Sequence, residues 1–585
     1  MKLSDYVADF LESHNVRDVF GITGGAIVHV FDSIAKNPKI RYICTEHEQA
    51  AAMAADAYSR ISRNIGVAIA TSGPGATNLV TGVCCSYFDS IPLLLITGQV
   101  PRSQLKKDSK SRQIGFQETD IVSMFSNITK YSVLVESPER IRYELEKAFF
   151  LARSGRPGPV LLDIPDDVQR AEVDPHKLQG FVEEPEMVDE VKLVKDVERV
   201  INLLETSERP VVILGNGIKL AQCEEKAINL IEKLGTPVAL TWATKDLLPF
   251  NHPQVIEGFG VSSERAGNFV VQNSDLIISF GSRLDTHETG NNQSTFARGA
   301  KKVIIDIDDS ELKKFKERGM KDIYLINSDV RLFLQALLQK QISMKDMSKW
   351  FVFINNLKEK YPICPSEYLE QKEYVNPYVF MAELSEQSKE NDIIITDAGA
   401  NLTWTMQGYR VKKGQTLFSA FNHSPMGYAL PASIGAVFAS RKDIICIIGD
   451  GGIQMNIQEL ATLAYHKLPI KIFLFNNSGY GIIQQTQDTW LNSRYVASNP
   501  DSSVAIPDLE RIAQAYGITT IRINNHSEMK DGIKYVLGYK GPILCNVSIE
   551  QHQKIIPKLE FGRPLEDSSP LLDRKEFNEN MIIDK

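Results

Sequence analysis

Short apolar runs alternate along the whole chain with segments whose apolar residues recur at helical spacing. Runs such as GVAIAT (66–71) and DIICIIG (443–449) are apolar at consecutive positions, as in parallel strands covered by helices on both faces. Segments such as ERIRYELEKAFFLARSG (139–155) carry apolar residues three or four positions apart, as on one face of a helix. This alternation predicts βαβ units and an α/β fold with parallel, helix-covered sheets. The predicted strands span 41–45, 66–71, 91–97, 159–164, 210–215, 237–240, 275–281, 302–308, 392–397, 443–449, 471–476 and 542–547.

Two segments interrupt this alternation and predict domain boundaries. Residues 165–191 are rich in proline and acidic residues and have no strong apolar period. Residues 345–379 are mixed in character and punctuated by prolines. The resulting blocks are each of ordinary domain size. We therefore expect three domains and a C-terminal arm, at residues 1–180, 190–342, 370–550 and 551–585.

The composition narrows the class of protein. The chain has 585 residues, 43% hydrophobic and 24% charged, with a net charge of −8. These values exclude a disordered, collagen-like or coiled-coil chain and argue against general binding of nucleic acids. The seven scattered cysteines include no CxxC pair, which indicates reduced thiols rather than a disulfide frame or a zinc site. The acidic, amphipathic N-terminus is unlike a signal peptide, and no apolar stretch could cross a membrane. We expect a cytoplasmic protein with no membrane or nucleic-acid partner.

The segment IICIIGDGGIQMNIQELATLAYHKLPIKIFLFNNSGYG (444–481) contains a strand, a glycine turn, a helix and a second strand. Asp450 follows the first strand and Asn477 follows the second. Carboxyl ends of neighbouring parallel strands meet at one edge of a sheet, where open α/β sheets bind ligands. The glycines let backbone N–H groups approach a phosphate, and carboxylate and amide oxygens suit Mg²⁺ or Ca²⁺. The alternative is a pair of ordinary turns, which is the better interpretation of GDG taken alone.

GDG followed by NN after one helix–strand unit resembles the motif of the thiamine diphosphate (ThDP) enzymes. The resemblance implies that Asp450, the Asn477 side chain and the Gly479 carbonyl bind Mg²⁺, and that the cation holds the diphosphate of the coenzyme. Other residues of the same two turns become candidate cofactor contacts, namely Gly449, Gly451, Gly452 and Tyr480.

The N-terminal block carries EHEQAAAMAADAYSR (46–60) and ATSGPGATN (70–78), which together resemble the pyrimidine domain of acetohydroxyacid synthase-like ThDP enzymes. The resemblance implies that Glu48 hydrogen-bonds N1′ of the aminopyrimidine and so promotes removal of the C2 proton of the thiazolium ring. It also implies that Pro74 and Asn78 line the pyrimidine. Without the resemblance, a carboxylate here would be interpreted as a charge that complements a helix dipole.

The same resemblance gives roles to residues in three other segments. Met426, in HSPMGYALPASIGA, matches the residue that forces the coenzyme into its bent shape, and the Ser424 carbonyl would face its 4′ amino group. The Gly25 region would place a backbone N–H beside the reacting centre. Gln117, in GFQETD, matches a glutamine near the substrate. Taken alone, these residues would be interpreted as core filling, an ordinary turn and a surface residue.

Three segments of the middle block, GNG (215–217), GSRLD (281–285) and DID (306–308), resemble those that hold FAD in acetohydroxyacid synthases, where FAD is not needed for the chemistry. The alternative is a purely structural block, as in several sister enzymes. The candidate FAD contacts are Gly215, Gly217, Arg283, Asp306 and Asp308.

The chain departs from the acetohydroxyacid synthases around the acceptor. Thr486 stands where they carry a tryptophan that favours 2-ketobutyrate, and Asn401, another candidate cofactor contact, replaces a histidine. The loop SQLKKDSKSRQIG (103–115) is longer and basic. Its Lys106 and Lys107 suit a phosphate-bearing acceptor, although such a cluster is more often a solvated loop. These departures resemble the branch of yersiniose-type carboligases, which act on nucleotide-linked deoxysugars.

We therefore expect a ThDP- and Mg²⁺-dependent carboligase, with FAD as a candidate third cofactor. It would decarboxylate pyruvate and transfer the two-carbon unit to a carbonyl acceptor, either pyruvate, giving 2-acetolactate, or a nucleotide-linked 4-keto-deoxysugar. The alternatives are a pyruvate oxidase or decarboxylase, and a non-catalytic ThDP-fold binding protein. In the family, the residues matching Glu48 and Asp450 meet across a subunit interface, so the resemblance implies a homodimer or homotetramer.

Overall fold

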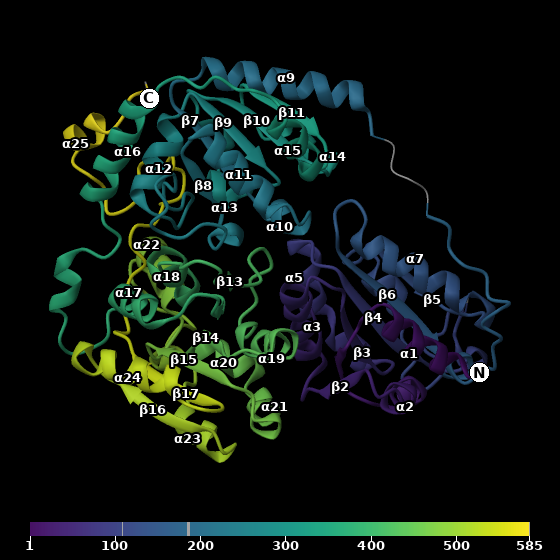
Figure 1. Ribbon diagram of the computed structural model, residues 1–585. Coiled ribbons are helices and arrows are strands. Elements are labelled where there is room, and N and C mark those ends of the chain that lie inside the picture. Colours follow the sequence, from purple (N-terminus) through teal and green to yellow (C-terminus); the bar gives the residue numbers. More distant parts are fainter. Residues whose placement is uncertain (108, 184–187, 584–585) are drawn as a thin grey trace.

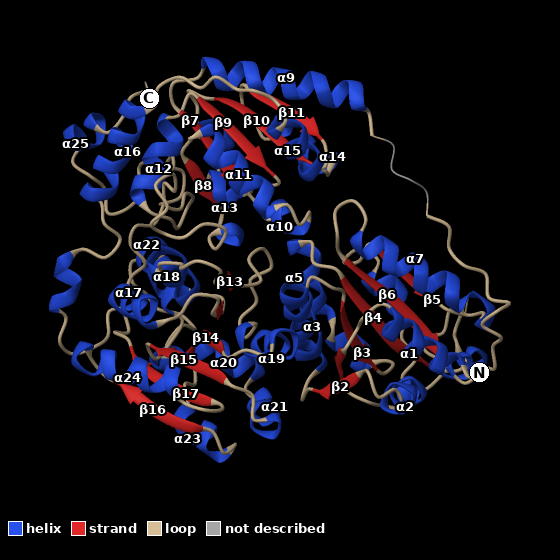
Figure 2. Ribbon diagram, viewed as in Figure 1, coloured by secondary structure: helices blue, strands red, loops and turns tan. Residues whose placement is uncertain are grey.

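The computed structural model describes residues 1–107, 109–183 and 188–583. These residues form three sheets, here called the N-terminal, central and C-terminal sheets, in which neighbouring strands are parallel. Helices lie against both faces of each sheet (Figures 1 and 2). The predicted α/β fold with parallel, helix-covered sheets is confirmed. No helix in these ranges combines the length and the apolar character that a bilayer crossing requires.

The N-terminal sheet has six strands in the order β2-β1-β3-β4-β6-β5. Strands β3, β4 and β6 are buried along their whole length because apolar and small residues dominate them. Their buried Asp163 carboxylate accepts from the Thr97 hydroxyl and the Gln99 amide. The strands are β1 (Asp18–Gly21), β2 (Arg41–Cys44), β3 (Gly66–Ala70), β4 (Leu93–Gln99), β5 (Tyr131–Leu134) and β6 (Pro159–Pro165). The helices of this block are α1 (Leu3–Ser13), α2 (Val28–Lys36), α3 (Glu48–Ser62), α4 (Pro74–Asn78), α5 (Val80–Asp89), α6 (Ile121–Phe125), α7 (Ile141–Arg153) and α8 (Asp166–Gln169).

The central sheet has five strands in the order β11-β10-β9-β7-β8. They are β7 (Pro210–Leu214), β8 (Val238–Leu240), β9 (Leu276–Phe280), β10 (Lys301–Asp306) and β11 (Ile323–Asn327). Its helices are α9 (Glu190–Thr206), α10 (Gly217–Leu220), α11 (Glu224–Leu234), α12 (Arg265–Asn273), α13 (Thr286–Thr289), α14 (Asp309–Glu317), α15 (Val330–Leu338) and α16 (Ser348–Lys360). Helix α16 begins inside the proline-punctuated segment and packs back onto this sheet, where the Trp350 indole N–H donates to the Pro210 carbonyl (3.2 Å).

The C-terminal sheet has the order β13-β12-β14-β15-β17-β16, which repeats the strand order of the N-terminal sheet. Its strands are β12 (Ile393–Thr396), β13 (Thr416–Phe418), β14 (Ile444–Gly449), β15 (Ile470–Asn476), β16 (Thr519–Ile523) and β17 (Ile543–Ser548). Its helices are α17 (Pro377–Gln387), α18 (Ala400–Gly408), α19 (Ala429–Ser440), α20 (Asp450–Ile453), α21 (Glu459–His466), α22 (Gly481–Trp490), α23 (Leu509–Ala515) and α24 (His526–Gly538).

Helices α3 and α19 join the N-terminal and C-terminal sheets within one chain (Figure 1). They approach so closely that a Cβ on Gly435 would lie 1.9 Å from the carbonyl oxygen of Ala54. The interface is also polar, because the Tyr428 hydroxyl donates to Asp56 Oδ1 (2.5 Å). Buried apolar residues of both blocks form one continuous core across this crossing.

The C-terminal arm returns to the central sheet, where α25 (Arg574–Glu579) lies beside α12 and α16 (Figure 1). Arg265 Nη1 donates to the Ser568 carbonyl (3.0 Å), and Asn273 Nδ2 donates to the Asn580 carbonyl (2.8 Å). The segment around Ser568 and Asn580 therefore packs against helix α12 of the central sheet.

Candidate active site

Asp450 is the first residue of α20, directly after β14, and it is only 2% exposed. Its Oδ1 accepts from the Gly451 backbone N–H (2.6 Å) and its Oδ2 from the Gly479 backbone N–H (3.2 Å). β14 and β15 are neighbours, with Gly449 opposite Phe475, so the turns after both strands meet at one edge of the sheet. The side chain of Asn477, 8% exposed, comes from the second turn.

These donors fit a divalent cation. Burial raises the pKa of the Asp450 carboxyl to about 7, although backbone N–H groups of the two turns act in the opposite direction. A carboxylate, an amide oxygen and a carbonyl are ligands that Mg²⁺ accepts, and the cation would hold Asp450 ionised. Within the described ranges, no group of three or more His, Cys, Asp or Glu side chains is arranged for a metal, so this candidate site depends on mixed oxygen donors.

The first turn needs glycine at Gly449 and Gly451, because a side chain at either position would lie close to neighbouring side chains. A Cβ on Gly451 would lie 2.3 Å from the Tyr480 ring and 3.4 Å from the Met426 methyl group. A Cβ on Gly449 would lie 3.2 Å from Asn401 Oδ1. Gly451, Met426 and Tyr480 therefore line one small region beside Asp450, which suits a phosphate held by backbone N–H groups.

The loop that carries Ser424 and Met426 is fixed by a residue that the sequence interpretation missed. Asp397 is wholly buried, and its carboxylate accepts from the backbone N–H groups of Gly427 (2.9 Å) and Ala429 (3.0 Å). Ser424 lies in this loop with a left-handed backbone (φ 49°). Asp397 follows β12 as Asp450 follows β14, so an Asp after a buried strand was the signal that could have identified it.

The other predicted site residues gather at the carboxyl edge of the N-terminal sheet. Glu48, 8% exposed, begins α3 after β2, and its Oε2 accepts from Asn78 Nδ2 (2.9 Å). A Cβ on Gly75 would lie 3.2 Å from Glu48 Oε1. Pro74 and Asn78 are exposed, which leaves this face of the carboxylate accessible to a ligand.

Gly25 and Gln117 lie at the same edge, after β1 and β4. Nothing lies within 4 Å of a Cβ built on Gly25, so its backbone is open to a ligand. Gln117 has a left-handed backbone (φ 64°), and its carbonyl oxygen lies 2.7 Å from the position of a Cβ on Gly73. The Gln99 amide supports this loop by donating to the Thr119 carbonyl (2.8 Å).

The residues that flank Glu48 contact the C-terminal block. The Glu46 backbone N–H donates to Glu459 Oε1 (3.0 Å), and Gln49 Nε2 donates to Asn456 Oδ1 (3.2 Å). Asn456 lies six residues after Asp450 and also donates to the Gly427 carbonyl (2.9 Å). The start of α3 is thus packed against the segment that follows the candidate metal turn.

Within one chain, the Glu48 and Asp450 carboxylates nevertheless form hydrogen bonds with different residues. The hydrogen bond of the Glu48 carboxylate stays on its own sheet, with Asn78. In the described part of the chain, no hydrogen bond joins Glu48 to Asp450 or Asn477. Among the described residues, the hydrogen bonds that join the start of α3 to the segment after the candidate metal turn therefore come from the neighbours of Glu48, namely Glu46 and Gln49.

A cavity of about 720 Å³ lies where the three blocks meet, and three of the five candidate FAD residues line it: Gly217, Arg283 and Asp306. Its size falls in the roughly 300–1,000 Å³ range of small-molecule and cofactor sites. A Cβ on Gly217 would lie 2.7 Å from Gly281 Cα, so glycine permits the two turns to pack at the cavity wall. Gly215 and Asp308 are adjacent to the lining but do not belong to it.

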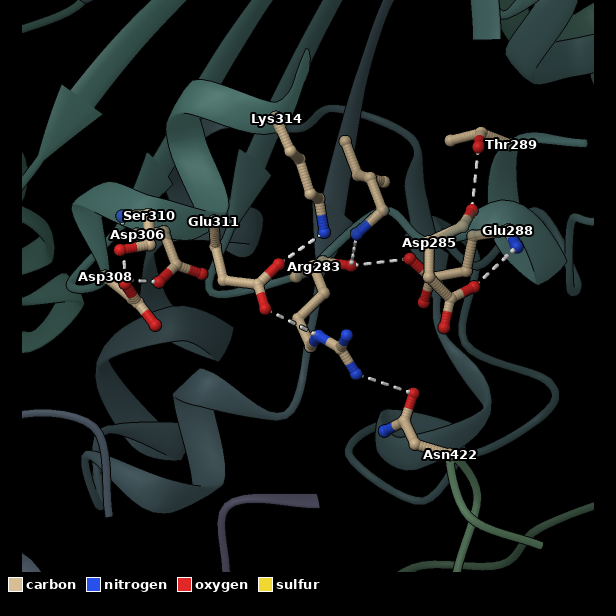
Figure 3. A network of polar contacts seen from close by, with 12 residues as sticks. Arg283, Asp285, Glu288, Thr289, Asp306, Asp308, Ser310, Glu311, Lys314 and Asn422 are labelled. Carbon is tan, nitrogen blue, oxygen red and sulfur yellow. Dashed lines mark hydrogen bonds and ion pairs between the residues drawn. The ribbon is translucent and has the colours of Figure 1, made fainter. Parts of the chain in front are cut away.

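Arg283 is at the centre of a polar network on the cavity wall (Figure 3). Its Nε donates to Glu311 Oε1 (3.2 Å) and its Nη1 to Asn422 Oδ1 (3.0 Å). Burial acts to raise the pKa of Glu311, but hydrogen bonds and charges from Lys314, Arg283 and Arg156 outweigh it and lower that pKa to about 2. Burial raises the pKa of Asp306 to about 6.

The predicted acceptor residues lie on two elements, the basic loop after β4 and helix α22. Lys107 and most of the basic loop after β4 are exposed, and the buried carboxylate of Glu118 accepts from the backbone N–H groups of Lys106 and Ile114. Glu118 therefore joins the two ends of the loop. Thr486 is half-buried on α22, where its hydroxyl donates to the Ile482 carbonyl (3.0 Å).

Comparison with protein families gives three matches in chain order. Residues 1–124 match the N-terminal TPP binding domain of thiamine pyrophosphate enzymes, residues 197–337 match their central domain, and residues 397–547 match their C-terminal TPP binding domain. The matched ranges contain the strands of the three sheets apart from β5, β6, β12 and the last residue of β17.

Curated proteins similar to this chain over nearly its whole length include acetolactate synthases. The large subunit from Cyanidium caldarium is 33% identical over 95% of this chain and 94% of its own length. The large subunit from Lactococcus lactis is 33% identical over 96% of this chain and 94% of its own length. The chloroplastic acetolactate synthase 2 from Zea mays is 35% identical over 97% of this chain and 88% of its own length.

Proposed function

Because the chain belongs to the thiamine pyrophosphate enzyme family, as an acetolactate synthase-like, ThDP-dependent carboligase, we propose that it decarboxylates pyruvate and joins the two-carbon unit to a second carbonyl compound. One observation carries the proposal. A buried carboxylate bound to an amide, Glu48 with Asn78, lies at the edge of the N-terminal sheet, and the Asp450–Asn477 turns lie at the matching edge of the C-terminal sheet.

When bound, ThDP supplies the carbanion chemistry that decarboxylation of a 2-ketoacid requires. The residues of this chain bind and orient the coenzyme. Asp450, Asn477 and the Gly479 carbonyl would hold Mg²⁺ against the diphosphate, and Met426 would pack against the coenzyme beside Gly451. Glu48 would hold and transfer a proton at N1′ of the pyrimidine ring. The exposed backbone N–H near Gly25 would stabilise negative charge on the substrate oxygen.

The favoured acceptor is a second molecule of pyruvate, with 2-acetolactate as the product. The support is the set of acetolactate synthases that match this chain over 95–97% of its length. We expect purified protein supplied with pyruvate, ThDP and Mg²⁺ alone to form acetolactate as the main product. Oxygen uptake would instead indicate an oxidase, and free acetaldehyde as the main product would indicate a simple decarboxylase.

A second acceptor class, a nucleotide-linked 4-keto-deoxysugar, is favoured by the basic loop at residues 103–115. Three of its cations, Lys107, Lys110 and Arg112, are exposed at the edge that carries Gln117. Guanidinium and ammonium groups there would bind the diphosphate of the acceptor. If little acetolactate forms from pyruvate alone, and a branched sugar forms once such a sugar is added, the acceptor is the nucleotide-linked sugar rather than a second molecule of pyruvate.

The central cavity is proposed to bind FAD. Its support is the size of the cavity and the arginines on its wall, Arg156 and Arg283, which suit a diphosphate. The half-buried Asp306 carboxyl lies on the same wall and could accept from ribose hydroxyls. Binding of FAD, and of ADP as the part of FAD that carries the diphosphate, is measured in the experiment described below.

The active unit is proposed to be a homodimer or a larger homo-oligomer. Phe116, beside Gln117, is 83% exposed, and Gly25, Pro74 and Asn78 are exposed at the same edge. An apolar side chain beside open coenzyme-binding residues suits a surface that another chain covers. A second chain could then supply the Asp450 turn to the Glu48 carboxylate.

A further inference from the structure

We propose that Asn422 couples the central cavity to the loop that carries Met426, so that a nucleotide bound in the cavity tightens the binding of ThDP. The inference rests on the nucleotide and coenzyme sites proposed above and adds a regulatory link between them. It concerns the Met426 loop, defined here as residues 419–428, which connects β13 to α19.

Two aspartates from different blocks hold the Met426 loop. Near the coenzyme site, the Asp397 carboxylate accepts from the Gly427 backbone N–H (2.9 Å). Near the cavity, the Asp89 carboxylate accepts from the backbone N–H groups of Phe421 and Asn422, each at 3.0 Å. Asp89, Phe421 and Asn422 all line the cavity. One end of the loop is therefore part of the cavity wall, and the other end lies beside the candidate coenzyme residues.

All three blocks meet at Asp89, which is 5% exposed. Within the N-terminal block, Arg60 Nη2 donates to its Oδ2 (2.8 Å). From the C-terminal block, Asn422 Nδ2 donates to its Oδ1 (2.7 Å). From the central block, Asn216 Nδ2 donates to its backbone carbonyl (3.3 Å). A shift of any one block would therefore change the hydrogen bonds of Asp89.

The side chain of Asn422 links the charged cavity wall to this position. Its Oδ1 accepts from Arg283 Nη1 (3.0 Å), and its Nδ2 donates to Asp89 (Figure 3 shows the Arg283 contact). Arg283 also donates to Glu311, which accepts from Arg156 Nη1 (2.9 Å). A diphosphate in the cavity would attract both arginines, so it would act directly on the group that holds the start of the Met426 loop.

A second, buried path reaches the other end of the loop. Arg60 pairs with Asp56 (2.7 Å) as well as with Asp89, and the Tyr428 hydroxyl donates to Asp56. The two ends of the loop therefore share one ion-pair network. Because breaking a buried ion pair is costly, Asp89 and Arg60 are poor test positions. Asn422 is exposed, so its replacement removes the link without leaving a buried charge unpaired.

The direction of the coupling follows from the loss of conformational freedom in the Met426 loop. A nucleotide that fixes Arg283 also fixes Asn422 and the start of the Met426 loop, and ThDP then binds to a loop with less freedom to lose. Such couplings are reciprocal and are typically about 5- to 150-fold. We expect the dissociation constant of ThDP to fall about five- to tenfold when the cavity is saturated with nucleotide.

The experiment is isothermal titration calorimetry of the full-length protein with ThDP in the presence of Mg²⁺. It is performed without nucleotide, with ADP and with FAD, and then in the reverse order to test reciprocity. Asn422→Ala and Asn422→Ser should bind nucleotide but show less than about a twofold effect on ThDP affinity. Gln222→Ala, which changes an exposed residue of the same cavity wall away from the loop, should keep the full effect.

The possible failures are distinguishable. Nucleotide binding that leaves ThDP affinity unchanged, or weakens it, overturns the coupling and leaves the nucleotide site standing. Full coupling in both Asn422 variants overturns the role of Asn422. If neither ADP nor FAD binds to the wild-type protein, the nucleotide site fails and the coupling fails with it. If ThDP itself does not bind, the proposed coenzyme site fails.

Discussion

Replacing Glu48 by glutamine is expected to lower turnover of pyruvate by about 10²- to 10⁴-fold, the usual contribution of a positioned acid or base. Glutamine keeps the size of the side chain and its contact with Asn78, but it cannot hold or release a proton. The affinity for ThDP should therefore stay close to that of the wild type. Turnover is measured from acetolactate formation at saturating pyruvate, and ThDP affinity by calorimetry.

Glu46→Gln is the matched control. Glu46 is exposed, belongs to the same turn, and contacts the C-terminal block through its backbone N–H, which the substitution retains. It should leave turnover within about a factor of two, as expected for an exposed site with no special contact. Turnover of Glu48→Gln equal to that of the wild type would show that Glu48 transfers no proton in the reaction.

In the Asp450→Asn variant, we expect the combined affinity for Mg²⁺ and ThDP to fall more than about 100-fold. Even residues that only support metal ligands change metal affinity 10- to 100-fold, so loss of the charged ligand should cost at least as much. The side chain keeps its shape, so the sheet should remain intact. The measurement is the Mg²⁺ concentration that gives half-maximal ThDP binding.

Asp443→Asn provides the control on the same strand. Asp443 precedes β14 at its other end, remote from the candidate turn, and its exposed carboxylate pairs with the buried Lys471 ammonium group (3.1 Å), which also donates to the Tyr539 and Gly541 carbonyls. Its Mg²⁺ requirement should match that of the wild type. Unchanged Mg²⁺ and ThDP affinity in Asp450→Asn would remove Asp450 from the proposed metal site.

The strands that could be predicted from the sequence are mostly those buried on both faces, and the exception is the edge strand β2, in which only Ile43 is buried. Each of the twelve predicted runs coincides with a strand, because continuous apolar residues are what a helix-covered parallel strand requires. The strands that were not identified by this pattern include the edge strands β5, β11 and β16, which are mostly half-buried and mix polar with apolar residues. The repeat of strand order between the first and third sheets left no fixed-period repeat in the sequence, because topology is set by packing rather than by residue identity.

The candidate site was predictable where its residues follow strands. Asp450 and Asn477 stand after β14 and β15, and this position alone made them candidate ligands. Glu48 follows β2, but its role came only from the family resemblance, because a carboxylate there would otherwise be interpreted as a charge that complements a helix dipole. The contacts of Asp89 with Asn422 were not predictable, because they join residues 333 positions apart in different blocks. Their alignment depends on how the three sheets pack.

The central claim is that Glu48 of one chain and Asp450 of another act on the same coenzyme. Mixing Glu48→Gln and Asp450→Asn proteins, after dissociation and reassembly, tests it directly. If sites form between two chains related by a two-fold axis, each hybrid dimer has one site with both substitutions and one with neither, and an equal mixture should regain about a quarter of wild-type activity. Activity no higher than the average of the two separate variants would contradict the claim, because sites within a single chain would each keep one defect.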